Sequence, residues 1–320
     1  MLSQDNSFLG GARVLITGGT GFLGREVVIR LANKGATVET VSRRTGVDLR
    51  NAAETLATFV SFRPDVIIHL AAKVGGIIAN MNSPGSFFYE NMLMGMNVVH
   101  AAHLCKARTL MVGTVCSYPK DCPVPFKEET LWEGYPEPTN APYGIAKKAL
   151  LVMLQAYRKE YDLRFGYLVP TNLYGPGDNF NDNSSHVIPA LIKRLFNAKQ
   201  VRRSQVECLG TGRVTRSFLH VCDAADAIAA AAANLDDNEP INLPGGPEIT
   251  MAGLTTLVAR LIGYEGEVRW DISKPDGQPR RLVDGTRAKR LLGWAPSRSL
   301  EEGLKSTINW YLQTRGMTIV

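Results

Sequence analysis

Residues 12–24 read ARVLIT-GGTGFLG, a short apolar segment followed at once by a glycine-rich turn. Apolar residues then recur at helical spacing until Gly35. A strand, a glycine-rich turn and a helix form a phosphate cradle, because backbone N–H groups and the positive end of the helix dipole face the anion. Many strand–turn–helix units carry glycines, but the spacing of Gly18, Gly21 and Gly24 is a variant of the dinucleotide fingerprint. The stretch therefore predicts a dinucleotide-binding unit.

Strands and helices alternate downstream of this turn, which predicts a parallel, doubly wound sheet. The fold class is thus α/β: a Rossmann-type doubly wound parallel sheet with a smaller C-terminal α/β substrate-binding domain. The first domain spans 1–177 with a return segment at about 216–247, and the second spans 178–215 and 248–320. Beyond residue 248 we expect helices and irregular segments. The predicted strands are 12–17, 37–41, 65–70, 109–113, 163–169, 206–209 and 240–243, and the predicted helices are 51–62, 84–106, 142–161, 186–197, 223–234 and 300–314.

The end of the second predicted strand indicates which nicotinamide cofactor to expect. NAD binders usually place an acid there for the ribose hydroxyls, whereas NADP binders place an arginine. Here the stretch reads Ser42-Arg43-Arg44, with no carboxylate before Asp48. Two guanidiniums suit a 2′-phosphate, although such a pair is also found in solvated loops. The expected cofactor is NADP(H).

Tyr143 and Lys147 lie four residues apart in a predicted helix, so they share one face, one turn apart. An ammonium beside a phenol favours the phenolate and lowers the pKa of tyrosine from about 10 toward neutrality. Such a tyrosine can exchange a proton with a substrate oxygen. The spacing alone also arises by chance, but Thr114 ends the fourth predicted strand, where ligands bind in such sheets. We predict a catalytic pair.

Cys116 lies two residues beyond Thr114, at the same end of that strand. A free cysteine is by default a small buried apolar residue, but a thiol near positive charge can act as a base. His186 opens a predicted helix and is either satisfied by the backbone or available to donate a proton. Cys116 and His186 are therefore candidates for proton transfer, each with a structural alternative.

Composition limits the class of protein. The chain has 320 residues, of which 45% are hydrophobic and 21% charged, as in ordinary soluble globular proteins. Its net charge of +6 is scattered in short pairs, which favours small polyphosphate ligands over nucleic acid. No run of about 18 apolar residues and no signal-peptide pattern occur, so no membrane association is predicted. Five cysteines without metal-ligand spacing predict reduced thiols, a cytoplasmic location and no metal site.

Several longer stretches are more specific than the glycine turn or the tyrosine–lysine spacing. With them the chain resembles the extended short-chain dehydrogenase/reductase family over nearly its whole length. Within that family it is similar to the NADPH-dependent 3,5-epimerase/4-reductases that convert GDP-4-keto-6-deoxy-D-mannose to GDP-L-fucose. The stretches are Leu70–Gly76 (LAAKVGG), Cys116–Lys120 (CSYPK), Glu137–Lys147 (EPTNAPYGIAK), Pro170–Pro176 (PTNLYGP), Ser185–Ala190 (SHVIPA), Arg216–Val221 (RSFLHV) and Ser273–Gly277 (SKPDG).

The resemblance implies roles for individual residues. Tyr143 would donate the proton in ketone reduction, with Lys147 as its ribose-binding partner and Thr114 bonded to the keto oxygen. Cys116 would be the epimerisation base and His186 the acid. Expected cofactor contacts are Gly18, Thr20, Gly21, Phe22, Leu23, Gly24, Arg43, Arg44, Asp48, Leu49, Leu70, Ala71, Ala72, Lys147, Pro170, Asn172, Leu173 and His186. Expected contacts of the GDP-sugar substrate are Lys73, Asn172, Val187, Arg194, Leu209, Arg216 and Lys274.

Two departures from the family pattern keep alternatives open. Thr114 stands where the family usually has Ser, and Leu209 stands where Trp is common. They favour, as an alternative, a reductase or epimerase/reductase of another GDP-4-keto-deoxy sugar, such as a deoxyheptose. A non-catalytic NADP-binding sensor is a second alternative. In this superfamily, helices equivalent to 84–106 and 142–161 pair between subunits, so a homodimer is expected.

Overall fold

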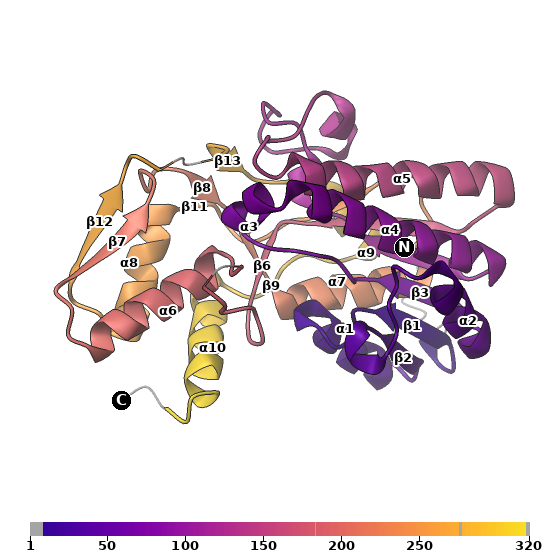
Figure 1. Cartoon of the computed structure of the whole chain (residues 1–320), viewed down its shortest axis with the longest axis horizontal. Helices are drawn as coiled ribbons and strands as arrows, with labels where there is room; N and C mark the ends of the chain where they lie inside the picture. The colour runs from indigo at the N-terminus through magenta and orange to yellow at the C-terminus, as the bar shows by residue number, and fades with distance from the viewer. Residues whose placement is uncertain (1–8, 183, 275–276, 318–320) are drawn as a thin grey trace.

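The structure is a computed structural model that describes residues 9–182, 184–274 and 277–317. Figure 1 shows a larger α/β body on one side and a smaller group of helices and short strands on the other. Pro275 and Asp276 of the SKPDG stretch lie outside the described residues, as do residues 1–8 at the start of the first predicted domain.

The larger body is built on a six-stranded sheet with the order β10-β5-β4-β3-β1-β2. Every neighbouring pair in it is parallel, as the alternation of strands and helices predicts. The strand order reverses between β1 and β3, and such a switch point is where doubly wound sheets bind ligands. The strands are β1 (Arg13–Thr17), β2 (Thr37–Val41), β3 (Val66–His69), β4 (Arg108–Val112), β5 (Phe165–Pro170) and β10 (Ile241–Leu243).

Helices cover both faces of this sheet, and two separate apolar clusters fill the spaces between them. One cluster joins α1 and α7 to one face, and the other joins α2, α4 and α5 to the opposite face. Figure 1 shows α4 and α5 side by side above the strands. The Ala-rich α7 packs its small side chains into the core, as predicted. The helices are α1 (Phe22–Asn33), α2 (Ala52–Phe62), α4 (Pro84–Leu104), α5 (Ala141–Tyr161) and α7 (Val221–Asn234).

The smaller part has its own apolar cluster, formed mainly by α6, α8, α10 and the β7–β12 pair. The expectation of helices and irregular segments beyond residue 248 was incomplete, because three short strands also form there. They pair with strands from earlier in the chain, and such long-range pairing leaves little local signal. The elements are α6 (Val187–Gln200), β7 (Gln205–Leu209), β11 (Ile249–Thr250), α8 (Met251–Ile262), β12 (Glu267–Asp271), β13 (Arg280–Arg281), α9 (Thr286–Leu292) and α10 (Leu300–Gln313).

Two small β groups lie outside the main sheet and the β7–β12 pair. β6 (Asn172–Tyr174) pairs with β9 (Phe218–His220), and β8 (Thr215–Arg216) lies between β11 and β13. The unpredicted elements include these short strands, the helix α3 (Ile77–Asn82) and the 3-10 turns η2 (Arg43–Thr45) and η4 (Glu128–Trp132). They are too short to show a periodic pattern. None of the described helices combines the length and apolar character needed to cross a membrane.

Candidate active site

The turn after β4 brings Thr114 and Cys116 to the start of α5. The chain leaves β4 at Val112 and forms the 3-10 turn η3 (Val115–Ser117), whose N-cap is Thr114. Thr114 Oγ1 accepts a hydrogen bond from Cys116 N at 3.2 Å, and Ser117 Oγ donates to Gly144 O at 2.8 Å. A side chain at position 144 would collide with Cys116 O. The glycine beside the predicted tyrosine therefore lets α5 approach the cysteine turn.

Tyr143 is thereby placed against Thr114 and Cys116, as the resemblance requires. Its ring packs edge-on against Phe87, with the ring centroids 6.4 Å apart. Burial raises the pKa of Tyr143, the charge on Cys116 raises it further, and a side-chain hydrogen bond with Thr114 lowers it in part. The predicted lowering of this pKa was wrong for the structure as it stands. Because burial outweighs the favourable contacts, the phenol holds its proton.

Lys147 lies one turn further along α5 and is almost fully buried, with 2% of its surface exposed. Its Nζ donates to Val112 O at 3.1 Å. Burial lowers the pKa of Lys147 to about 8 from an ordinary value of 10.5. The ammonium is therefore anchored on the end of β4, and desolvation weakens its charge. This explains why it does not lower the pKa of Tyr143 as the spacing predicts.

We expect the burial of Lys147 to make the unfolding free energy of the protein depend on pH. The folded pKa of Lys147 lies below the unfolded value, so the unfolded chain binds more protons between about pH 8 and 10.5. Stability from this group therefore rises with pH in that window. Between pH 7 and 9.5 the unfolding free energy of the wild type, measured in urea without nucleotide, should rise by about 2 kcal/mol relative to that of Lys147→Met. A difference that stays flat would show that the lysine is not desolvated.

His186 is the N-cap of α6, and its side chain makes no capping hydrogen bond. The side chain is about half exposed (47%), and its Nδ1 lies 3.9 Å from Oδ1 of the buried Asp178. The alternative, in which the backbone satisfies the hydrogen bonds of the His186 side chain, is therefore not supported. The imidazole is accessible for proton transfer. Asp178 Oδ2 is buried without a hydrogen-bond partner among the described residues.

The glycine turn fits a dinucleotide. Gly18 has a φ of +73°, and a Cβ there would lie 2.8 Å from Ala71 N. The turn Leu70–Ala72 that follows β3 thus passes directly against the glycine turn. The N-terminus of α1 has no side-chain cap and no acidic residue in its first turn. Its free N–H groups and dipole are suited to a pyrophosphate.

Gly24 is the position in this turn where we expect a substitution to be most harmful. A Cβ there would meet Gly18 O and would lie 2.6 Å from Gly19 Cα, so the backbone itself must move. Gly24→Ala should lower the unfolding free energy by about 1–3 kcal/mol and weaken NADPH binding at least about tenfold.

The control for Gly24→Ala is Gly85→Ala, since a Cβ at Gly85 meets no atom within 4 Å. That variant should stay within about 0.5 kcal/mol of the wild type. Urea unfolding measures the stability, and NADPH fluorescence titration measures the affinity. Unchanged affinity in Gly24→Ala would contradict the assignment of the turn.

Arg43 and Arg44 lie exposed on η2, directly after β2. This turn is tied to the glycine turn, because Thr20 Oγ1 donates to Ser42 Oγ at 3.1 Å. Asp48 is held by Arg50, whose Nη2 lies 2.6 Å from Oδ2 of Asp48. Arg50 lowers the pKa of Asp48 to about 2. The first carboxylate after β2 is thus engaged by an arginine, while the guanidiniums of Arg43 and Arg44 remain exposed.

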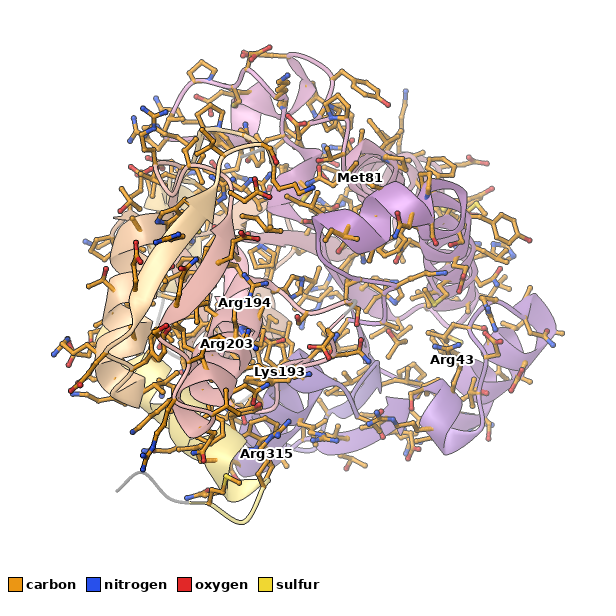
Figure 2. All side chains as sticks on the ribbon, turned by 60° about the vertical axis from the view of Figure 1, so that its left-hand side comes forward. Arg43, Met81, Lys193, Arg194, Arg203 and Arg315 are labelled. Carbon is orange, nitrogen blue, oxygen red and sulfur yellow. The ribbon has the colours of Figure 1, made fainter. Side chains whose placement is uncertain are left out.

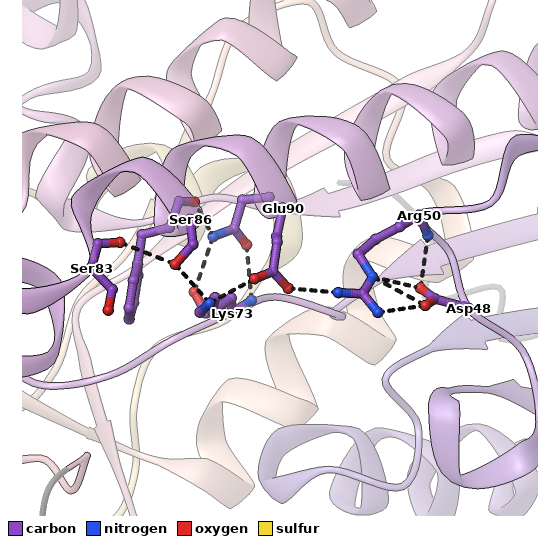
Figure 3. A network of polar contacts seen from close by, with 8 residues as sticks. Asp48, Arg50, Lys73, Ser83, Ser86 and Glu90 are labelled. Atoms are coloured by element: carbon purple, nitrogen blue, oxygen red, sulfur yellow. Dashed lines mark hydrogen bonds and ion pairs between the residues drawn. The ribbon is translucent and has the colours of Figure 1, made fainter.

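Figure 3 shows that the same network continues to Lys73. Lys73 Nζ contacts Glu90 Oε1 at 2.6 Å and Ser86 Oγ at 2.8 Å, and Glu90 also contacts Arg50 at 3.2 Å. Lys73, an expected substrate contact, is therefore already paired within the protein. Leu49, an expected cofactor contact, is buried, and its carbonyl accepts from Asn97.

The other expected substrate contacts come from the smaller part and the connections to it. Arg194 on α6 is exposed, and its Nη1 donates to Glu207 O at 2.7 Å. Figure 2 places Arg194 beside β7 and α6, well apart from Arg43. The two arginines are thus positioned for different anionic groups. Val187, Leu209 and Lys274 are exposed, Arg216 is partly buried on β8, and Asn172 Nδ2 donates to Ser217 O at 3.3 Å.

Sequence reasoning missed one charged side chain at this site. Arg281 belongs to one of the short basic pairs in the sequence and was given no role there. It is buried, with its Nη1 3.7 Å from Cys116 Sγ. Its neighbour Arg280 instead forms an exposed ion pair with Glu248. The sequence pattern does not distinguish the two arginines, because only the pairing of β13 with β8 decides which one faces inward. Within the described ranges, no group of three or more His, Cys, Asp or Glu side chains could hold a metal ion.

The sheet with its glycine turn and the tyrosine–lysine helix define a nicotinamide-dependent enzyme of the Rossmann type. The sequence pattern of the NAD dependent epimerase/dehydratase family matches residues 14–243 of this chain. The chain belongs to this family, and the resemblance to extended short-chain dehydrogenases/reductases is confirmed.

Three known proteins are similar to this chain over nearly its whole length. A probable GDP-L-fucose synthase 1 from Oryza sativa subsp. japonica is 40% identical over 305 residues, covering 95% of this chain and 93% of the relative. The structure of a GDP-L-fucose synthetase from Naegleria fowleri bound to NADP matches with a TM-score of 0.86 and 29% identity, over 100% of this chain and 96% of that one. A GDP-6-OMe-4-keto-L-xylo-heptose reductase from C. jejuni matches with a TM-score of 0.88 and 27% identity, over 95% and 98%.

Proposed function

We propose that the chain is an NADPH-dependent 3,5-epimerase/4-reductase that converts GDP-4-keto-6-deoxy-D-mannose to GDP-L-fucose. The observation that carries the proposal is the grouping of Thr114, Cys116 and Tyr143 at the end of β4. It supplies two hydrogen-bonding hydroxyls and one thiol at a single place. A base beside donors for a keto oxygen is what proton abstraction next to a ketone needs.

Epimerisation requires a proton to leave one face of the sugar and return to the other. The thiolate of Cys116 takes the proton from the carbon next to the keto group, and the electron pair moves onto the ketone oxygen. Thr114 and Tyr143 hydrogen-bond that oxygen and stabilise its charge. His186, accessible at the start of α6, returns a proton to the carbon from the opposite face. The same steps serve C3 and C5.

Reduction then fixes the new configuration. NADPH, when bound, supplies the hydride to C4. Tyr143 gives its proton to the oxygen at C4, and the raised pKa that burial gives this phenol keeps the proton in place until then. Lys147 lies one turn from Tyr143, and its Nζ donates to Val112 O. It holds the cofactor ribose and stays mostly protonated near neutral pH, since its pKa is about 8.

The choice of NADP(H) over NAD(H) is also a proposal. The exposed Arg43 and Arg44 on η2 would hold the 2′-phosphate, since guanidiniums form paired hydrogen bonds with phosphate oxygens. Asp48 is engaged by Arg50 and so is a poor partner for free ribose hydroxyls. The remaining cofactor contacts are expected on the glycine turn and on the Leu70–Ala72 turn.

A related substrate is the first alternative. Thr114 has a branched Cβ that restricts its rotamers, and Leu209 lacks the ring that the family commonly offers. The likeness to a structure whose name specifies a keto-heptose reductase supports the same possibility. A non-catalytic NADP-binding sensor is the second alternative, and the joint retention of Tyr143, Lys147, Cys116 and His186 argues against it.

Solvent deuterium distinguishes these functions. In D2O with NADPH, a 3,5-epimerase/4-reductase places deuterium at C3 and C5 of the product. A plain reductase oxidises NADPH without that label, and a sensor does neither. Nucleotide sugars with a heptose in place of the hexose test the first alternative in the same assay.

We further propose a division into a cofactor domain (1–177 with 216–247) and a substrate domain (178–215 with 248–320). The separate apolar cluster of the smaller part supports it. We also propose a homodimer formed by α4 and α5, which leave large apolar side chains such as Tyr89, Leu104 and Val152 exposed. A monomer mass by light scattering at working concentration would exclude the dimer.

A further inference from the structure

Arg281 reaches Cys116 from a distant part of the chain. It lies on β13, which pairs in parallel with β8, opposite Arg216. The guanidinium Nη1 is 3.7 Å from the thiol sulfur, and the two residues are 165 positions apart in sequence. Only 8% of Arg281 is exposed. This is a contact made by the fold, not a consequence of local sequence.

The arginine is held in this place on two sides. Its Nε donates to Gln278 Oε1 at 3.2 Å, and Gln278 Nε2 donates to Lys120 O at 2.7 Å. Lys120 belongs to the loop that follows Cys116, so guanidinium and thiol are fastened to the same segment. On the other side, Phe126 N donates to Leu282 O at 2.8 Å. Because these contacts already fix the side chain, it loses little conformational entropy when its guanidinium pairs with an anion.

The charge balance around Arg281 also points to the thiol. Among the described residues, no Asp or Glu lies within ion-pair distance of Arg281, whereas its exposed neighbour Arg280 pairs with Glu248. A buried cation without an anion is costly, and a thiolate at the observed position would balance it. Tyr143 faces the same sulfur from α5, and the charge on Cys116 raises the pKa of that phenol.

We propose that Arg281 is a positioning residue that holds Cys116 in its thiolate form. The thiol releases its proton to solvent, and the sulfur anion pairs with the guanidinium. The thiolate then accepts the proton from the carbon beside the ketone, as the proposed function requires. The proposal rests on that function only for this last step, because the ion pair belongs to the enzyme without substrate.

Iodoacetamide alkylation of Cys116 tests the ion pair directly, with the site followed by peptide mass spectrometry. At pH 7, Arg281→Gln should slow alkylation about tenfold, because the thiolate fraction falls. Arg281→Lys should restore most of the rate. The control, Arg280→Gln, removes an equal charge from the neighbouring position and should change the rate less than about twofold. At pH 10, where an ordinary thiol is largely ionised without help, all four proteins should agree within about twofold.

Two results would overturn the proposal. An unchanged rate in Arg281→Gln, or equal slowing at pH 7 and pH 10, would show that Arg281 controls access or structure instead of charge. A raised KM for the GDP-sugar with normal alkylation would make Arg281 a phosphate ligand.

Solvent-deuterium exchange then tests the step that depends on the proposed function. We expect Arg281→Gln to slow deuterium exchange into the substrate about tenfold. If the wild type itself shows no exchange, the proposed function fails while the alkylation result still decides the role of Arg281.

Discussion

Replacing Tyr143 by Phe should lower ketone reduction by at least about 1000-fold, because the proton for the oxygen at C4 loses its donor. The ring and its packing against Phe87 remain, so NADPH affinity should stay within about threefold of the wild type. Deuterium should still enter the substrate, more slowly, since Thr114 continues to hydrogen-bond the ketone oxygen. Stopped-flow NADPH oxidation measures the reduction, and NMR in D2O measures the exchange.

The matched control is Tyr157→Phe on the same helix. It removes a hydroxyl that contacts His100 Nδ1 at 3.2 Å and should leave both rates within about twofold. Reduction at the wild-type rate in Tyr143→Phe would remove the tyrosine from the mechanism. Loss of NADPH binding in that variant would instead indicate that the phenol holds the cofactor and is not the donor.

Replacing Cys116 by Ser should abolish deuterium exchange at C3 and C5, with a loss of about 100- to 1000-fold. A hydroxyl is far less acidic than a thiol, so the neighbouring Arg281 cannot hold it as an anion. NADPH oxidation should fall less, and any reduced product should keep the starting configuration at both carbons. The product is analysed by NMR after complete consumption of NADPH.

Cys105→Ser is the control for this experiment. Cys105 is a partly buried free cysteine at the end of α4. Its replacement should leave exchange and reduction within about twofold of the wild type. Exchange at full rate in Cys116→Ser would remove the thiol as the base and, with it, the role given to Arg281.

The main sheet was predictable because its strands are short and mostly apolar, and several of them are followed by a local signal. The glycine turn after β1 and the arginine pair after β2 are examples, and β2 begins and ends where predicted. Tyr143 and Lys147 share a helix face, as their spacing predicts. The spacing could not show how deeply each side chain is buried, and burial decides both pKa values. This is why the predicted direction was wrong for Tyr143.

The contacts that were not predictable depend on pairings between distant segments. Arg280 and Arg281 are indistinguishable in sequence, yet one is paired on the surface and the other is buried beside the thiol. Gln278 carried no signal, although it links Arg281 to the loop after Cys116. Likewise, no pattern in the sequence indicated that Asp178 lies near His186. The functional side chains that directly follow a strand of the main sheet could be predicted from the sequence. Arg281 could not, because its position depends on the pairing of a strand of two residues.

The most direct test of the proposed activity is a single assay of the purified protein with GDP-4-keto-6-deoxymannose and either NADPH or NADH. We expect NADPH to be oxidised in amounts equal to the sugar, a product epimerised at C3 and C5 and reduced at C4, and a clearly lower kcat/KM with NADH. No turnover with either cofactor, despite NADPH binding, would contradict the activity and favour a sensor.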